Sequence, residues 1–133
     1  MGSGPSASRG RSGIAHYVKV LLDEMMAKEM ADLLVGHDVA HVVDLGWRHI
    51  SNGKLLTMAE TSGFQAFITK DGNIPYQQNL AGRVIGLLIL RPKTQDVLDL
   101  LGMVPEILLA LSQLNPGDVL RVPTEPRATA EYT

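Results

Sequence analysis

The sequence predicts one α/β domain in three layers, with a mainly parallel central sheet of about five strands between layers of helices. Three observations support this prediction. The 133 residues are the length of a single domain. Their composition, 45% hydrophobic and 20% charged, is that of a globular protein. The apolar residues also alternate between the spacing of strands and the spacing of helices, which is typical of βαβ units joined by right-handed crossovers.

The first half of the chain contains three predicted strands, over residues 18–22, 37–43 and 64–69. Between the first two strands, apolar residues recur at helical spacing over positions 26–34 and predict a helix. Between the second and the third, Ser51 is placed to cap another helix.

The second half continues the alternation. The nearly unbroken hydrophobicity of residues 84–90 is typical of a central strand that is covered on both faces. A helical stretch follows over residues 94–114, with a break near 102–105, and residues 117–122 predict the last strand.

The domain is expected to span residues 14–122. The Gly/Ser/Arg-rich segment 1–13 and the tail 123–133 have little apolar surface to bury, so we expect both to be flexible.

Composition excludes several classes of function. The chain has no cysteine, and therefore no disulfide, thiolate metal site or cysteine nucleophile. The net charge of −2 argues against a broad positively charged surface for nucleic acid, although it does not exclude a small basic patch. No apolar run is long enough to cross a bilayer, so we expect a cytoplasmic protein without membrane contact.

Acidic residues follow three of the predicted strands. Asp23 and Glu24 come after the first strand, Asp44 after the second and Asp71 after the third. The carboxyl ends of parallel strands meet at one edge of a sheet, where ligands of α/β proteins bind. A simpler interpretation is that these residues are helix caps and turn residues.

Clustered carboxylates would repel one another, and a divalent cation would relieve that repulsion. Oxygen ligands favour Mg²⁺ or Mn²⁺, and such an ion can activate water and stabilise charge on a phosphate. The acidic strand ends therefore predict a site for phosphate chemistry.

Four segments resemble the small bacterial PIN-like domains, relatives of the VapC-type toxin nucleases. They are VLLDE (20–24), DLGW (44–47), SNGKLL (51–56) and TKDGNIPYQQNL (69–80). The resemblance covers about residues 18–122 and is most specific in the last segment. It implies a PIN-like fold and a Mg²⁺- or Mn²⁺-dependent ribonuclease of the toxin–antitoxin type, with RNA as substrate and an antitoxin protein as partner.

The resemblance also implies roles for individual residues. Asp23 would be the first metal carboxylate and Asp71 the second, with Glu24 supporting them in catalysis. Asn73 falls where many relatives carry a further Asp, so it is a third candidate metal ligand.

Two residues depart from the pattern of this family. Met25 stands where relatives often have Asn or Cys, and Lys54 stands where they usually have a carboxylate. Lys54 could pair with Asp23 or Asp71 and partly replace the cation, or it could point outward and contact substrate phosphate. Glu60 cannot replace the missing carboxylate, since six residues at 100° place it about 240° around the helix.

Further candidates for substrate binding lie in two loops. Trp47 and Arg48 follow the second strand, where an aromatic ring beside a cation could stack on a base and hold phosphate. Tyr76 and Gln77 follow the third strand and could line the same cleft. Trp47 could instead cover the core, and the 76–79 segment could be an ordinary polar loop.

The two histidines His37 and His41 are four residues apart in a predicted strand, which is poor spacing for a zinc pair. We expect them to be ordinary surface or edge residues.

Two alternatives remain open. A PIN-like module without activity is consistent with Met25 and Lys54, and the apolar residues of 97–114 could then serve a homodimer or an antitoxin helix. A receiver-type phosphoacceptor domain would also carry an Asp after the third strand. Such a domain should have Ser or Thr after the fourth strand and Lys after the fifth, whereas the sequence there reads Ile-Leu-Arg and Leu-Arg-Val.

Overall fold

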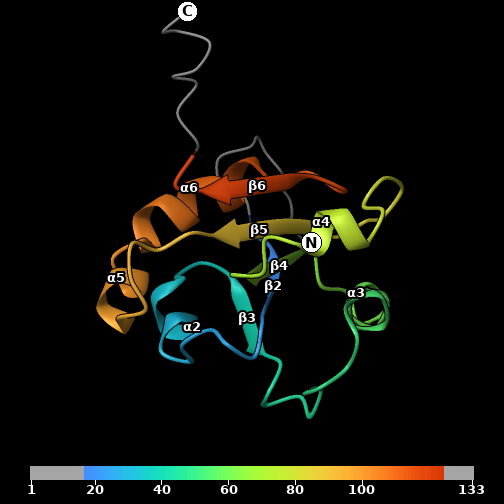
Figure 1. The fold of residues 1–133 in the computed structure, drawn as a ribbon, viewed down its shortest axis with the longest axis horizontal. Coiled ribbons are helices and arrows are strands. Elements are labelled where there is room, and N and C mark those ends of the chain that lie inside the picture. The colour runs from blue at the N-terminus through green and yellow to red at the C-terminus, as the bar shows by residue number, and fades with distance from the viewer. Residues whose placement is uncertain (1–16, 125–133) are drawn as a thin grey trace, which may run out of the picture.

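A computed structural model describes residues 17–124, and Figure 1 shows its arrangement. The predicted flexible segment 1–13 and most of the predicted tail lie outside the described residues. The elements in chain order are β2 (Lys19–Leu22), α2 (Met30–Leu33), β3 (Asp38–His41), α3 (Asn52–Thr61), β4 (Ala66–Thr69), α4 (Ile74–Gln77), β5 (Gly86–Leu90), α5 (Val97–Leu101), α6 (Val104–Gln113) and β6 (Val119–Val122).

The five strands form one sheet in the order β3-β2-β4-β5-β6, and every neighbouring pair is parallel. This confirms the predicted parallel sheet. In the register of the sheet, Leu21 of β2 pairs with Ala40 of β3 on one side and with Phe67 of β4 on the other. The chain leaves β2 toward one edge of the sheet and leaves β4 toward the other, so the point where strand order reverses lies between these two strands.

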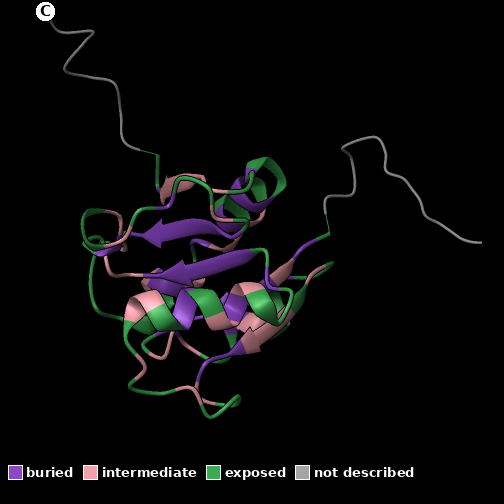
Figure 2. Cartoon of the chain, turned by 90° about the vertical axis from the view of Figure 1, so that its right-hand side faces the viewer, coloured by how far each residue is buried: buried purple, intermediate pink, exposed green. Residues whose placement is uncertain are grey.

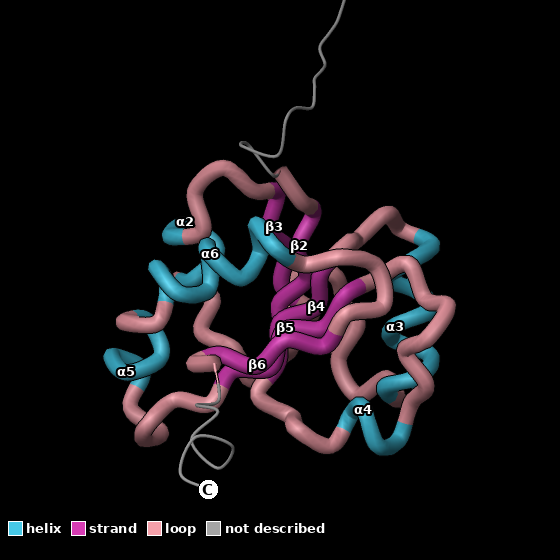
Figure 3. The backbone as a smooth tube through the Cα atoms, turned by 90° about the horizontal axis from the view of Figure 1, so that it is seen from above, coloured by secondary structure: helices cyan, strands magenta, loops and turns pink. Residues whose placement is uncertain are grey.

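The core has one layer on each side of the sheet, because successive side chains of a strand point to opposite faces. One layer joins strand residues such as Val20 and Leu22 to α2, α5 and α6, and the other joins Leu21 and Phe67 to α3 and α4. Figure 3 shows the two groups of helices on either side of the sheet, and Figure 2 shows the buried strands between them. The three predicted layers are therefore present.

The helices differ from the prediction in two places. The helix expected over 26–34 is only the single turn α2, and the chain before it forms tight turns, with the Met26 N–H donating to the Asp23 carbonyl (3.0 Å). Leu33, expected on the apolar face, is 42% exposed. Residues 74–77 form the unpredicted turn α4, which buries Ile74. No helix among residues 17–124 is long and apolar enough to cross a membrane.

His41 corrects the expectation that both histidines are surface residues. It ends the edge strand β3, but its side chain is only 3% exposed. Its Nδ1 accepts from the Val43 N–H (3.1 Å), so Nε2 carries the proton and donates to the Met26 carbonyl (2.8 Å). His41 therefore holds the turn after β2 against the end of β3, and that is why it is buried.

Candidate functional site

The candidate site lies at the carboxyl ends of β2 and β4, where strand order reverses. Asp23 is the first residue after β2, and its N–H donates to the carbonyl of Ile68 in β4 (3.0 Å). This bond continues the pairing of the two strands by one residue. The backbone of Asp23 is therefore held by the sheet, although the residue lies in a loop.

Thr69 is the residue around which the site is built. It is the last residue of β4 and fully buried, and its hydroxyl donates to Asp23 Oδ2 (2.6 Å). The same hydroxyl oxygen accepts from the N–H of Asp71 (3.0 Å). The 2.6 Å distance between the Thr69 hydroxyl and Asp23 Oδ2 is typical of a hydrogen bond from a hydroxyl to a carboxylate. Thr69 thus joins the two predicted metal carboxylates, Asp23 directly and Asp71 through its backbone.

Sequence reasoning missed this role of Thr69. The available signal was a polar side chain at the end of a strand that is otherwise fully apolar, AFIT. Because a buried hydroxyl needs a partner, such a residue points to a polar neighbour at the strand end.

Asp71 organises the loop that follows β4. Its Oδ1 accepts from the N–H of Asn73 (2.9 Å), which closes a local turn. The Asn73 carbonyl then accepts from the N–H groups of Tyr76 (3.0 Å) and Gln77 (3.2 Å), which begins α4. Asp71 is half-buried and Asn73 is exposed. Within residues 17–124, Asp71 Oδ2 forms no hydrogen bond or ion pair, so this oxygen is available to a ligand.

Glu24 links the site to the loop after β3. Its N–H donates to Asp23 Oδ1 (2.8 Å), so that both oxygens of the Asp23 carboxylate are bound. Its own Oε1 accepts from the N–H of His49 (3.3 Å). His49 has a φ of 62°, a left-handed conformation that is uncommon outside glycine. Glu24 therefore positions this loop beside the carboxylates.

The start of α3 forms the next part of the site. Lys54 lies in its first turn and is exposed. Of the two predicted alternatives, an ion pair with Asp23 or Asp71 is not formed, since the salt bridges of the described residues are Lys28–Asp44 and Arg83–Glu60. The Lys54 ammonium group therefore faces solvent.

The expectation that Glu60 cannot replace the missing carboxylate agrees with its contacts. It pairs with Arg83 (2.7 Å) and accepts from the N–H of Val84 (2.6 Å), which fixes the segment before β5.

The beginning of α3 contacts α4 through two residue pairs. The Asn52 side-chain amide donates to Gln77 Oε1 (3.4 Å). Gly53 packs so closely on Gln78 that an added Cβ would lie 2.8 Å from its Oε1. These contacts fix one wall of the site, on the side of the sheet covered by α3 and α4.

The predicted substrate-binding residues fall into two groups. Trp47 is half-buried, and its ring packs edge-on against Phe64 (6.2 Å between centroids, 76° between planes), which favours the interpretation that it covers the core. Arg48, Tyr76 and Gln77 are exposed, and Tyr76 is 82% exposed. Arg48 belongs to the loop that Glu24 holds, and Tyr76 and Gln77 belong to α4.

Asp44 does not join the site, which corrects the expectation of three acidic strand ends. It is exposed and pairs with Lys28 (2.9 Å), whose hydrogen bond lowers the pKa of the Asp44 carboxyl. Across residues 17–124, no three or more His, Asp or Glu side chains are close enough to hold a metal ion together. The acidic edge is therefore a pair of aspartates with Glu24 beside it.

Asp23 and Asp71 are fewer carboxylates than a closed metal cage requires. Mg²⁺ usually keeps several waters and takes only one or two carboxylates. Asp23 is held in place by Thr69, and Asp71 has an oxygen without a protein partner among the described residues. A proposal of a metal ion therefore rests on Asp23 and Asp71, since the described residues do not supply three carboxylates.

A receiver-type phosphoacceptor domain should have Ser or Thr at its fourth strand end and Lys near its fifth, and the described strands have neither there. The fourth and fifth strands end at Leu90 and Val122, so no Ser, Thr or Lys stands at either end. At the third strand end the residue is Thr69, and Asp71 lies two residues beyond it.

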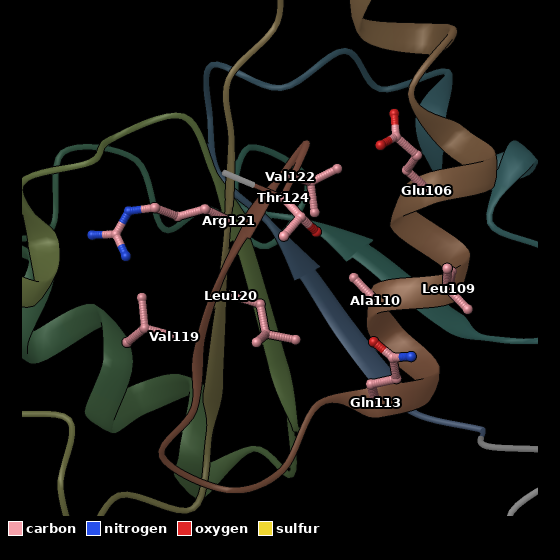
Figure 4. A pocket seen from close by; sticks show the side chains of 9 residues that line it. All are labelled: Glu106, Leu109, Ala110, Gln113, Val119, Leu120, Arg121, Val122 and Thr124. Carbon is pink, nitrogen blue, oxygen red and sulfur yellow. The ribbon is translucent and has the colours of Figure 1, made fainter. Parts of the chain in front are cut away.

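A separate hollow of about 370 Å³ lies between α6 and the edge strand β6, away from the carboxylates. Figure 4 shows Leu120 and Val122 directed toward α6, whereas Arg121 and Val119 point to the opposite face of the sheet. This hollow is a groove beside an unpaired sheet edge and contains none of the predicted site residues.

Comparison with protein-family models, with curated proteins and with solved structures finds no match to this chain. The resemblance to PIN-like domains therefore stays a prediction, and the function has to be argued from the geometry.

Proposed function

We propose that this chain is a PIN-like, metal-dependent ribonuclease of the toxin–antitoxin type that hydrolyses RNA phosphodiester bonds. The observation that carries the proposal is the convergence of Asp23 and Asp71 on the hydroxyl of Thr69, at the point of the sheet where strand order reverses. Mg²⁺ is usually bound through one or two carboxylates and keeps several waters, and Asp23 and Asp71 would supply these two.

In this proposal each residue of the site has its own role. Asp23 and Asp71 would hold the ion, which when bound supplies an activated water and a positive charge next to the phosphate. Thr69 orients the Asp23 carboxylate. Glu24 holds the loop of Arg48 and His49 against the site through its bond to the His49 N–H.

Lys54 takes the role of a phosphate contact in this proposal. A lysine ammonium at about 4 Å from a metal ion would repel it by about 4 kcal/mol at an effective dielectric of about 20. The exposed Lys54 is not paired with either aspartate, so it can move away from the ion. Together with the exposed Arg48 it provides cations for the RNA backbone.

Cleavage of total cellular RNA tests the proposal. Purified protein is incubated with Mn²⁺, with Mg²⁺ and with EDTA, and the Asp23→Asn and Asp71→Asn variants are compared with Asp44→Asn. Asp44 is the matched control, because it is also an aspartate after a strand but pairs with Lys28 on the surface. We expect metal-dependent cleavage that the first two substitutions reduce to the EDTA background, while Asp44→Asn cleaves like the wild type.

The contrary result is cleavage that persists in EDTA, or that Asp71→Asn leaves unchanged. Circular dichroism of each variant establishes that a loss of cleavage is not a loss of folding.

A second candidate is a PIN-like module that binds a partner and does not cleave RNA. Two observations favour it. The carboxylates number fewer than in a three-ligand metal group, and Leu98 and Leu109 are 71% and 61% exposed on the α5–α6 side. An exposed apolar surface of this kind suits a protein partner or a second copy of the chain. Binding of Mn²⁺ with micromolar affinity would argue against this candidate.

A further inference from the structure

A second hollow lies on the side of the sheet opposite α3, and its lining includes chain neighbours of the two aspartates. It has a volume of about 210 Å³, below the roughly 300–1,000 Å³ of most sites for drug-sized ligands. Its lining comes from three segments, the turn after β2, the residue after β4 and the connection from β5 into α5. Met25 lies two residues after Asp23, and Lys70 lies directly before Asp71, so the hollow adjoins the segments of the candidate site.

The floor of this hollow is apolar. Met26 and Leu100, which are 4% and 5% exposed, form part of its lining and belong to the core layer of α2, α5 and α6. Met25 lines it as well but is 69% exposed, which is unusual for a methionine beside a polar site. A thioether is polarisable and contacts aromatic rings favourably, so these walls suit a flat aromatic group.

The polar part of the lining holds one charge of each sign, Lys70 and Asp96, and Asp96 Oδ1 accepts from the N–H of Leu98 at the start of α5 (2.9 Å). Lys70 lies between Thr69 and Asp71 in the chain and lines the hollow, and it forms no hydrogen bond or ion pair with any other residue of the described range. Gln95, which also lines the hollow, is exposed and offers both a donor and an acceptor. Of the two charged side chains, Asp96 caps α5 and Lys70 has no partner among the described residues, so a ligand with an aromatic ring and an anionic group placed at Lys70 would match the lining.

We propose that this hollow binds one nucleotide of single-stranded RNA, with its base against Met25 and Met26 and its phosphate on Lys70. This inference rests on the proposed function for the choice of RNA as ligand. Only an unpaired base can turn its face to a protein surface, so the site selects single strands. The strand would then cross the sheet edge from this hollow, past the two aspartates, to Lys54 and Arg48.

The test is equilibrium binding in EDTA, which separates it from any test of cleavage. The probe is a fluorescein-labelled single-stranded RNA of about ten nucleotides, followed by anisotropy between about 50 and 200 mM salt. Lys70→Gln is compared with Lys19→Gln, which removes the same charge at the opposite end of the sheet, where Lys19 Nζ donates to the Ser62 carbonyl (2.8 Å). Met25→Ser tests the base contact, and its exposed position makes misfolding a minor concern.

We expect Lys70→Gln to weaken binding and to reduce the salt slope by about 0.7, the value for one phosphate of a single strand. Met25→Ser should raise Kd roughly two- to ten-fold with an unchanged slope. Lys19→Gln should bind like the wild type, and the RNA annealed to its complement should bind more weakly.

Equal effects of the two lysine substitutions would overturn the inference, as would an unchanged Kd for Met25→Ser or equally tight binding of the duplex. If the protein cleaves RNA while these variants bind normally, the proposed function stands and this site is wrong. If they behave as expected but no cleavage occurs, the site stands and the nuclease proposal fails.

Discussion

The carboxyl ends of β2 and β4 and the carboxyl end of β3 lie at the same edge of one sheet, yet their aspartates have different environments. Asp23 and Asp71 are half-buried and meet at the hydroxyl of Thr69. Asp44 is exposed and pairs with Lys28 in solvent. A shared sheet edge is therefore not enough to join the residues that follow its strands, and here the buried hydroxyl of Thr69 links the Asp23 carboxylate to the Asp71 backbone.

The difference has a structural origin in how each strand ends. Asp23 follows β2 directly and is still hydrogen-bonded to β4. Asp44 comes three residues after the end of β3, within a turn in which its N–H donates to the His41 carbonyl (3.0 Å). The side chain that occupies the end of β3 is His41, which is bonded to the turn after β2 and leaves no carboxylate there.

The largest effect on stability is expected from replacing Thr69, whose hydroxyl binds both Asp23 and Asp71. Thr69→Val keeps the shape of the side chain but leaves Asp23 Oδ2 and the Asp71 N–H without their partner. An unsatisfied polar group costs about 1–3 kcal/mol when it is buried, and these two groups are half-buried. We therefore expect a total loss of stability of roughly 2–3 kcal/mol and a Tm lower by roughly 5–15 °C. Thermal unfolding measures it.

Thr69→Ser is the control for that prediction, because it retains the hydroxyl. It should recover most of the stability, with a cost of only about 1 kcal/mol for the lost methyl group. Equal destabilisation by Val and Ser would mean that packing of the methyl group, and not the shared hydrogen bonds, is what Thr69 contributes.

The smallest effect on stability is expected from replacing Asp44. The hydrogen bond from Lys28 lowers the pKa of this carboxyl, so its contribution to stability is present above the unfolded pKa and is lost as pH falls through the folded pKa. We expect Asp44→Asn to lower Tm slightly at neutral pH, and the difference from wild type to vanish as the pH falls below the lowered folded pKa of Asp44. Added salt should also reduce it.

Melting curves of both proteins across this pH range check the prediction. A difference that persisted in acid would show that Asp44 contributes through something other than its charge.

Much of the fold could be predicted from the sequence, because alternating apolar spacing reports which faces are buried. The run 84–90 did predict the fully buried interior strand β5. The helix expected over 26–34 was wrong since the spacing of Met26 and Met30 could not reveal the turns that precede α2. Burial of His41 depends on a contact with Met26 across the chain, and apolar periodicity carries no information about it.

The candidate site was predictable only in part. Asp23 and Asp71 follow strands directly or nearly so, and the sequence indicated both. The role of Thr69 depends on the register between β2 and β4, which sets Thr69 opposite the residue after Leu22. No pattern along the chain specifies that register. Asp44 was assigned to the site because the end of β3 was placed two residues too late.

The most direct test of the central claim, that Asp23 and Asp71 form one site and Asp44 does not belong to it, is calorimetric titration with Mn²⁺. The wild type should bind one ion, Asp23→Asn and Asp71→Asn should each abolish that binding, and Asp44→Asn should leave it unchanged. Binding that survives Asp71→Asn, or that is weakened equally by Asp44→Asn, would contradict the account.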